Sequence, residues 1–230
     1  PDGWEYRSTP MPYDPFTFAA LPDGRLAGVT YQGRLVQTTP DWSMAALAPL
    51  PTGVAEGMTL SALGLGADRR LYFAPCATAR VGRWDPEEDA LREPQVVSPF
   101  PGQVDAFGVA GERLYLATGD PCAVLCYYPD LPARLLENPK LVGKVGPGRP
   151  VGTMSYLLGH LYFAVAGADE GALVRILPIQ DRLTVHPGVV PGQQPTGMVV
   201  DRFNHWLLVG GRSATRPAAV ACWCPDAEAI

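Results

Sequence analysis

The sequence contains little lysine, little charge of either sign and no long apolar stretch. Lysine occurs only at Lys140 and Lys144, and charged residues make up 18% of the 230 positions. The net charge of −5 and the pI of about 5.2 argue against the basic surface that nucleic acids and anionic membranes require. No apolar run approaches the roughly 20 residues that span a bilayer. We therefore expect no nucleic-acid partner and no membrane span.

A starting methionine is also missing. The chain begins "PDGWEY", which indicates a processed product or part of a larger polypeptide. A removed leader would favour an extracytoplasmic or secreted location, and the compartment itself stays unknown.

Cysteine and histidine are too few, and wrongly spaced, for a zinc site. Five cysteines and three histidines occur, without any CxxC spacing. The odd number of cysteines prevents complete internal pairing. One disulfide stays open as an alternative, between Cys76 and Cys122, which occupy similar loop positions and would be joined only in an oxidising compartment.

Glycine and proline, in contrast, are abundant, with 25 of each, and this indicates many turns. Between the turns an apolar phrase recurs, as in "RRLYFAP" and "ERLYLATG". The leucines that open successive copies are 45, 43, 47 and 46 residues apart, so five similar units account for the chain. These leucines are Leu26, Leu71, Leu114, Leu161 and Leu207.

Each unit is made of short apolar runs rich in Val, Leu, Tyr and Phe, bounded by Gly, Pro or Asp. Such runs are typical of strands, and four strands in roughly 40–50 residues are typical of a propeller blade. The sequence therefore predicts an all-β fold, a five-bladed β-propeller with four antiparallel strands per blade, as a single domain over residues 1–230. Trp84 and Trp223, near the ends of third strands, are expected to pack between blades. The approximate blades are 16–50, 57–100, 103–148, 151–192 and 195–230 with 3–9.

The last unit has room for only three strands. Residues 3–9 stand where a fourth strand would, so we expect this N-terminal strand to pair onto the last blade. Such velcro closure would remove the open edge of the sheet. The alternative is a fragment of a ring with six to eight blades.

The segment "PTGMVVDRFNHWLLVGG", at Pro195–Gly211, follows the order P-x-G-hydrophobic-x-x-D and then a hydrophobic strand. It resembles the blades of NHL-type, YVTN-type and gluconolactonase-like propellers, and the pattern is degenerate elsewhere, as at Pro150–Val165. Five units of this size are also similar in layout to tachylectin, a sugar-binding ring. The resemblance implies the propeller fold and brings no catalytic motif.

In propellers, the loops before the first strand and those between the second and third strands gather on one face, which is the usual ligand site. We call it the loop face. Here these loops carry polar and aromatic side chains of both charges, which suit hydrogen bonding to a small polar molecule, a glycan or a protein. The ligand-binding residues predicted on this basis are Tyr13, Asp14, Tyr31, Glu56, Asp105, Arg149 and Gln194.

Three carboxylates of this set, Asp14, Glu56 and Asp105, come from successive blades. Together they could bind a divalent ion such as calcium, or act as an acid and base pair. They could equally be solvated turn residues, since Asp14 precedes Pro15. Their distances from the repeat leucines are 12, 15 and 9 residues, so the spacing does not show that they converge.

No catalytic constellation stands out. We therefore expect a non-catalytic binding or scaffold propeller that needs no cofactor, with calcium as the one candidate, and that recognises a small polar ligand, a carbohydrate or a protein partner. The alternative is a metal-dependent lactonase-like enzyme or a glycoside hydrolase that uses the three carboxylates.

Overall fold

The computed structural model describes residues 15–21, 23–30, 34–38, 44–49, 60–76, 78–98, 102–135, 137–167 and 170–225. Within these ranges the chain forms β-strands and one short 3-10 turn, η1 (Pro178–Gln180), and no α-helix. Accordingly, the described ranges contain no helix of the length and hydrophobicity that crossing a membrane would require.

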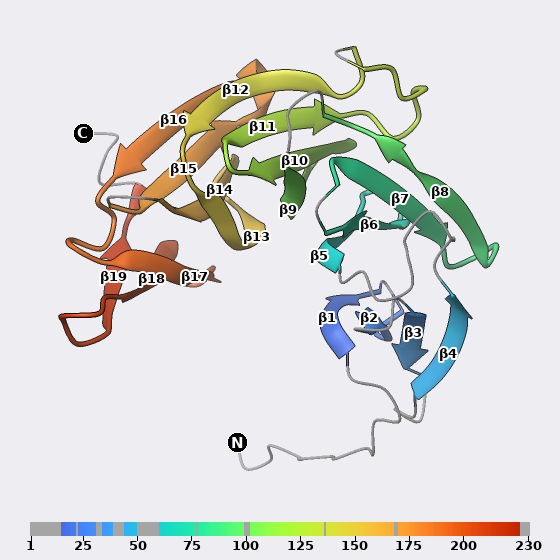
Figure 1. The fold of residues 1–230 in the computed structure, drawn as a ribbon, viewed down its shortest axis with the longest axis horizontal. Helices are drawn as coiled ribbons and strands as arrows, with labels where there is room; N and C mark the ends of the chain where they lie inside the picture. Colours follow the sequence, from blue (N-terminus) through green and yellow to red (C-terminus); the bar gives the residue numbers. More distant parts are fainter. Residues whose placement is uncertain are drawn as a thin grey trace.

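The strands form five antiparallel sheets, each built from strands that follow one another in sequence (Figure 1). The all-β, five-bladed propeller is thereby confirmed. Blade 1 contains β1 (Pro15–Ala20), β2 (Leu26–Thr30), β3 (Arg34–Thr38) and β4 (Met44–Pro49). Blade 2 contains β5 (Leu60–Leu65), β6 (Leu71–Pro75), β7 (Arg80–Asp85) and β8 (Ala90–Val96). Blade 3 contains β9 (Gln103–Ala110), β10 (Arg113–Gly119), β11 (Cys122–Tyr127) and β12 (Lys140–Gly146).

Blade 4 has four strands and blade 5 has three in the described part of the chain. They are β13 (Arg149–Leu157), β14 (His160–Ala166), β15 (Ala172–Leu177) and β16 (Arg182–Pro187), and then β17 (Gln194–Asp201), β18 (Trp206–Arg212) and β19 (Ala219–Trp223). The segment 3–9, predicted to complete blade 5, lies outside the described residues.

The first strand of each blade lies innermost, and these strands pack side by side in the order β1, β5, β9, β13, β17 (Figure 1). No comparable packing joins β17 to β1 within the described ranges. Closure of the ring therefore stays a prediction.

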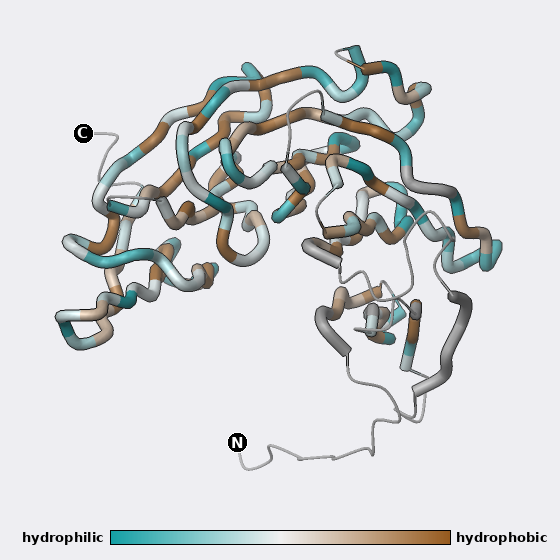
Figure 2. The backbone as a smooth tube through the Cα atoms, viewed as in Figure 1, coloured by the Kyte–Doolittle hydropathy of each residue, from teal (hydrophilic) through white to brown (hydrophobic). Residues whose placement is uncertain are grey.

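The core lies between the blades. Leu71, Leu114, Leu161 and Leu207, four of the five repeat leucines, are at most 1% exposed. In blades 2, 3 and 4 the second strand has both faces covered, because its sheet is packed between two neighbours, and this explains why the repeated phrase is a continuous apolar run there rather than an alternating one. Figure 2 shows hydrophobic residues recurring along the strands of successive blades.

Large aromatic side chains fill these interfaces, as predicted for Trp84 and Trp223. Trp84 is 1% exposed and packs in the cluster between blades 1 and 2. Trp223 packs against the cluster between blades 4 and 5, with its ring centroid 5.5 Å from that of Tyr162. Side-chain packing of this kind is what holds one sheet against the next.

Candidate functional site

Two of the predicted ligand-binding residues form an ion pair between blades 3 and 4. Asp105 lies in β9 and Arg149 opens β13. Nη2 and Nε of Arg149 lie 3.0 and 3.2 Å from the two carboxylate oxygens of Asp105, which is a bidentate arrangement. The amide of Gln103 also donates a hydrogen bond to Asp105, at 2.5 Å.

The two partners differ in exposure. The Asp105 side chain is 8% exposed and the Arg149 side chain 55% exposed. The hydrogen bonds to Asp105 raise the pKa of Arg149, so its positive charge is secure. In this pair the carboxylate is therefore buried and the guanidinium is exposed to solvent.

Gly119, the last residue of β10, gives the carboxylate its space. A Cβ atom there would overlap the Asp105 carboxylate and lie 3.1 Å from Nε of Arg149. The sequence "ATGD" places glycine where the ion pair needs room.

Gln194 joins the next pair of blades. It opens β17, and its side-chain oxygen accepts a hydrogen bond from the backbone N–H of Gly167, at 2.9 Å. A further contact of this type links blades 3 and 4, since Asp120 accepts a hydrogen bond from the backbone of Gly148 at 3.4 Å. The polar side chains of the loop face thus tie neighbouring blades together.

The other predicted site residues cannot be placed. Tyr13, Asp14, Tyr31 and Glu56 lie outside the described residues. In the part of the chain that is described, no three His, Cys, Asp or Glu side chains gather as metal ligands. The carboxylate trio stays a prediction, of which only Asp105 has a known environment.

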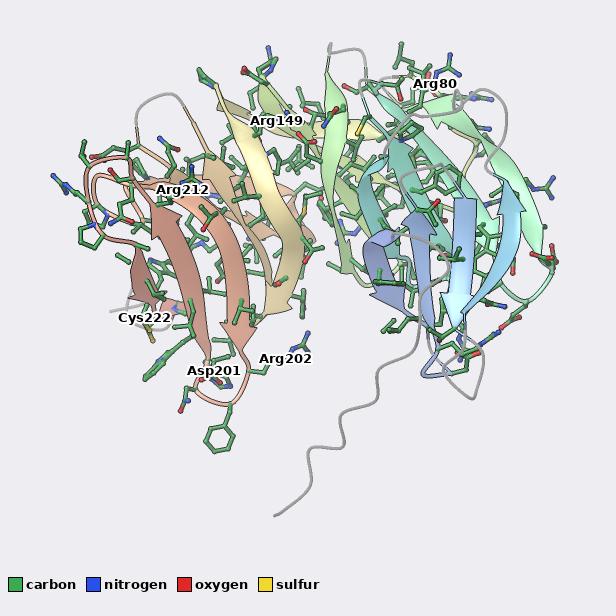
Figure 3. The ribbon with its side chains drawn as sticks, turned by 60° about the horizontal axis from the view of Figure 1, so that its bottom comes forward. Arg80, Arg149, Asp201, Arg202, Arg212 and Cys222 are labelled. Atoms are coloured by element: carbon green, nitrogen blue, oxygen red, sulfur yellow. The ribbon has the colours of Figure 1, made fainter. Side chains whose placement is uncertain are left out.

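Three exposed arginines share the loop face. Arg80 opens β7, Arg149 opens β13 and Arg212 ends β18. Figure 3 shows all three at one end of the blades, with Asp201 and Arg202 at the other end. A chain with net negative charge thus displays cations from three blades on one face.

No disulfide joins any of the five cysteines in the structure, so the alternative bond between Cys76 and Cys122 is not formed. Cys122 is fully buried at the start of β11. Burial, reinforced by the nearby Asp105, raises the pKa of the Cys122 thiol to about 12. Because the thiolate is the reactive form, Cys122 is a packing residue rather than a nucleophile.

A cavity of about 440 Å³, which was not predicted from the sequence, lies between blades 2 and 3. Arg70, Arg83 and Arg92 line it together with Tyr72 and Tyr127. These residues lie within strands or beside them, whereas the ligand-binding residues predicted from the sequence were expected in loops.

No protein-family model matches the chain, and no curated protein sequence does either. Solved structures share its fold. A hydrazine synthase structure from Kuenenia stuttgartiensis has a TM-score of 0.68 at 12% identity, covering 98% of this chain and 66% of its own. Virginiamycin B lyase from Staphylococcus aureus has a TM-score of 0.65 at 15% identity, covering 90% and 69%.

YCF48 from Cyanidioschyzon merolae is similar too, with a TM-score of 0.61 at 14% identity over 96% of this chain and 72% of its own. A YCF48 structure bound to a D1 peptide has a TM-score of 0.62 at 14% identity over 96% and 67%. Our chain thus spans about two thirds of the length of these neighbours.

Identities of 12–15% show the fold alone. The narrower resemblances, to NHL-type, YVTN-type and gluconolactonase-like blades and to tachylectin, stay predictions. The comparisons show a β-propeller, a fold that this chain shares with an enzyme and with a peptide-bound protein.

Proposed function

We propose that the protein is a non-catalytic binding propeller that recognises a protein partner on its loop face. The observation that carries the proposal is the Asp105–Arg149 pair. Asp105, the only described carboxylate of the predicted catalytic trio, is buried and bonded to Arg149 in a bidentate manner. The guanidinium of Arg149 is exposed to solvent.

A general acid or base must exchange a proton with its substrate within hydrogen-bond reach. Asp105 is poorly suited to that task, because Arg149 and Gln103 occupy its oxygens and little of the side chain is exposed. The geometry therefore favours binding over glycoside or lactone hydrolysis.

The partner chemistry we propose is an acidic segment of another protein. Arg80, Arg149 and Arg212 are exposed on the same face, and the planar guanidinium matches a carboxylate in a bidentate manner. YCF48, whose fold is similar, has been solved with a bound peptide, which supports peptide recognition by such a scaffold. A glycan or a small polar molecule is the competing outcome.

An array of acidic, neutral and basic peptides, with a glycan array beside it, tests the proposal. We expect the wild-type chain to retain acidic peptides, and Arg149→Gln and Arg212→Gln each to weaken binding roughly tenfold. Arg202→Gln, at the opposite end of blade 5, is the matched control and should bind like the wild type. Because Arg149→Gln removes the ion-pair partner of Asp105 and can therefore also affect folding, Arg212→Gln separates lost binding from lost folding.

Two results would overturn the proposal. One is unchanged peptide binding in both loop-face variants, and the other is retention of glycans with no retention of any peptide. The alternative enzyme is tested by adding calcium: a higher melting temperature that Asp105→Asn abolishes would support a metal site with Asp14 and Glu56.

A further inference from the structure

The cavity between blades 2 and 3 is separate from the proposed loop-face site. It is bounded by β6, β7 and β8 on one side and by the chain that follows β11 on the other. Its volume of about 440 Å³ lies within the range of small-molecule sites.

Two arginines in its wall stand directly opposite each other. Arg83 in β7 pairs with Arg92 in β8 in the antiparallel register. Like charges in directly opposed positions destabilise a sheet. Within the described ranges neither arginine forms an ion pair with an acid, whereas the third cation of the cavity, Arg70, lies 2.8 Å from Asp85.

The cavity therefore holds an excess of positive charge. Asp130, which is exposed, is the one carboxylate in its lining, and it pairs with neither arginine. The buried Tyr72 remains a neutral phenol, because burial and its 2.7 Å hydrogen bond to Asp68 raise its pKa. Two guanidiniums thus face one exposed carboxylate.

The rest of the wall is aromatic and apolar. The rings of Tyr72 and Tyr127 meet edge to face with centroids 6.3 Å apart, and Pro129, Leu131 and Pro132 continue the surface. Leu131 is 55% exposed although it lines the cavity. Such a wall suits the apolar body of a ligand better than a free inorganic ion.

We propose that this cavity binds a small molecule that carries a phosphate or carboxylate on an aromatic or apolar body, with the oxyanion bridging Arg83 and Arg92. The anion would form charge-assisted bonds to both guanidiniums and would remove their mutual repulsion. The aromatic wall would hold the body of the ligand.

Thermal unfolding and calorimetry of the full chain with phenyl phosphate test the proposal, at constant ionic strength. We expect phenyl phosphate to raise the melting temperature more than inorganic phosphate or phenol does. Arg83→Gln and Arg92→Gln should each weaken its binding about tenfold, the size of one charged hydrogen-bond pair. Arg134→Gln is the matched control, since Arg134 is 71% exposed beside the cavity and is not part of its lining.

A second measurement needs no ligand. Without an anion and at low salt, Arg92→Gln should raise the melting temperature, because it relieves the Arg83–Arg92 repulsion; an arginine with a purely structural role would lower it. The proposal fails if phenyl phosphate gives no stabilisation, if both cavity variants bind as the wild type does, or if Arg134→Gln weakens binding equally. Arg149→Gln should bind phenyl phosphate as the wild type does, because Arg149 lies on the loop face and does not line the cavity.

Discussion

Gly119, at the end of β10, makes the Asp105–Arg149 pair possible. Its missing Cβ leaves the space that the carboxylate fills. Asp105 and Arg149 were each predicted from the sequence as site residues. Their pairing could not be predicted, because they are 44 positions apart and meet only when two blades pack.

Gly119→Ala should therefore break the bidentate contact. We expect a loss of roughly 1–3 kcal/mol in the free energy of unfolding, the usual cost of overpacking, and weaker binding of acidic peptides. Urea denaturation measures the first effect. Gly143→Ala in β12 is the control, because a Cβ there would lie 3.6 Å from Leu183, an ordinary contact. Equal stability of the two variants would contradict the prediction.

Asp181 is a second residue on which contacts between blades converge. It accepts hydrogen bonds from Tyr115 at 2.8 Å and from Arg113 at 3.2 Å, and its other oxygen lies 2.5 Å from Nζ of Lys140. Burial by itself would raise the pKa of Asp181, but the bonds from Lys140 and Tyr115 outweigh it and lower that pKa.

A lowered pKa in the folded state means that Asp181 stabilises the fold above its unfolded pKa, about 3.9, and that this stabilisation disappears as the pH falls through the folded value. Asp181→Asn should thus cost about 1–3 kcal/mol at pH 7 and progressively less below pH 4. Urea denaturation across pH measures the difference. Glu137→Gln, in a pair with both side chains 71% exposed, should change little. A pH-independent difference would contradict this explanation.

At the scale of elements, the sequence predicted strands and hairpins well. The repeat leucines open or lie one residue inside the second strands, and the polar pieces "GADRR" and "DRFNH" form the turns before two of them. Register was harder to predict. The irregularity between Val81 and Arg83 decides that Arg83 faces Arg92, and no local sequence signal reports such a shift.

The turn between β13 and β14 departs from the usual preference. Leu158 and Gly159 both have positive φ, of 48° and 81°, as a tight hairpin turn requires, and Leu158 is 40% exposed. Asparagine tolerates this backbone better than leucine does. Leu158→Asn should raise the melting temperature by up to a few degrees, roughly 1 kcal/mol or less. Leu158→Val should lower it, and the reverse order would contradict the assignment of the turn.

At the scale of the whole molecule, one face of blade 5 is not covered by any described residue. Val199 and Val220 are 60% and 70% exposed on it, and Trp206 is 42% exposed. The N-terminal strand predicted for this blade would pair along the edge of β19. The number of blades could be predicted from composition and repeat length. The segment that completes the ring could not be settled in this way, because residues 3–9 do not carry the repeated apolar phrase.

Deletion of residues 1–9 tests that closure. If the segment pairs with β19, its loss should lower the melting temperature by about 2–4 °C for each kcal/mol of lost stability. Val220→Asp weakens the same edge. Combined with the deletion, it should therefore lower the melting temperature little further than the deletion alone does. An unchanged melting temperature after deletion would contradict N-terminal closure.

Every described sheet is built from strands that are neighbours along the chain, so each blade can form without waiting for distant segments. Stability then resembles that of a row of coupled units, in which each unit gains from the one beside it. Blades 1 and 5, each packed on a single described neighbour, are the units from which fraying should begin, and amide protons of blade 3, held on both sides, should be the last to exchange with solvent.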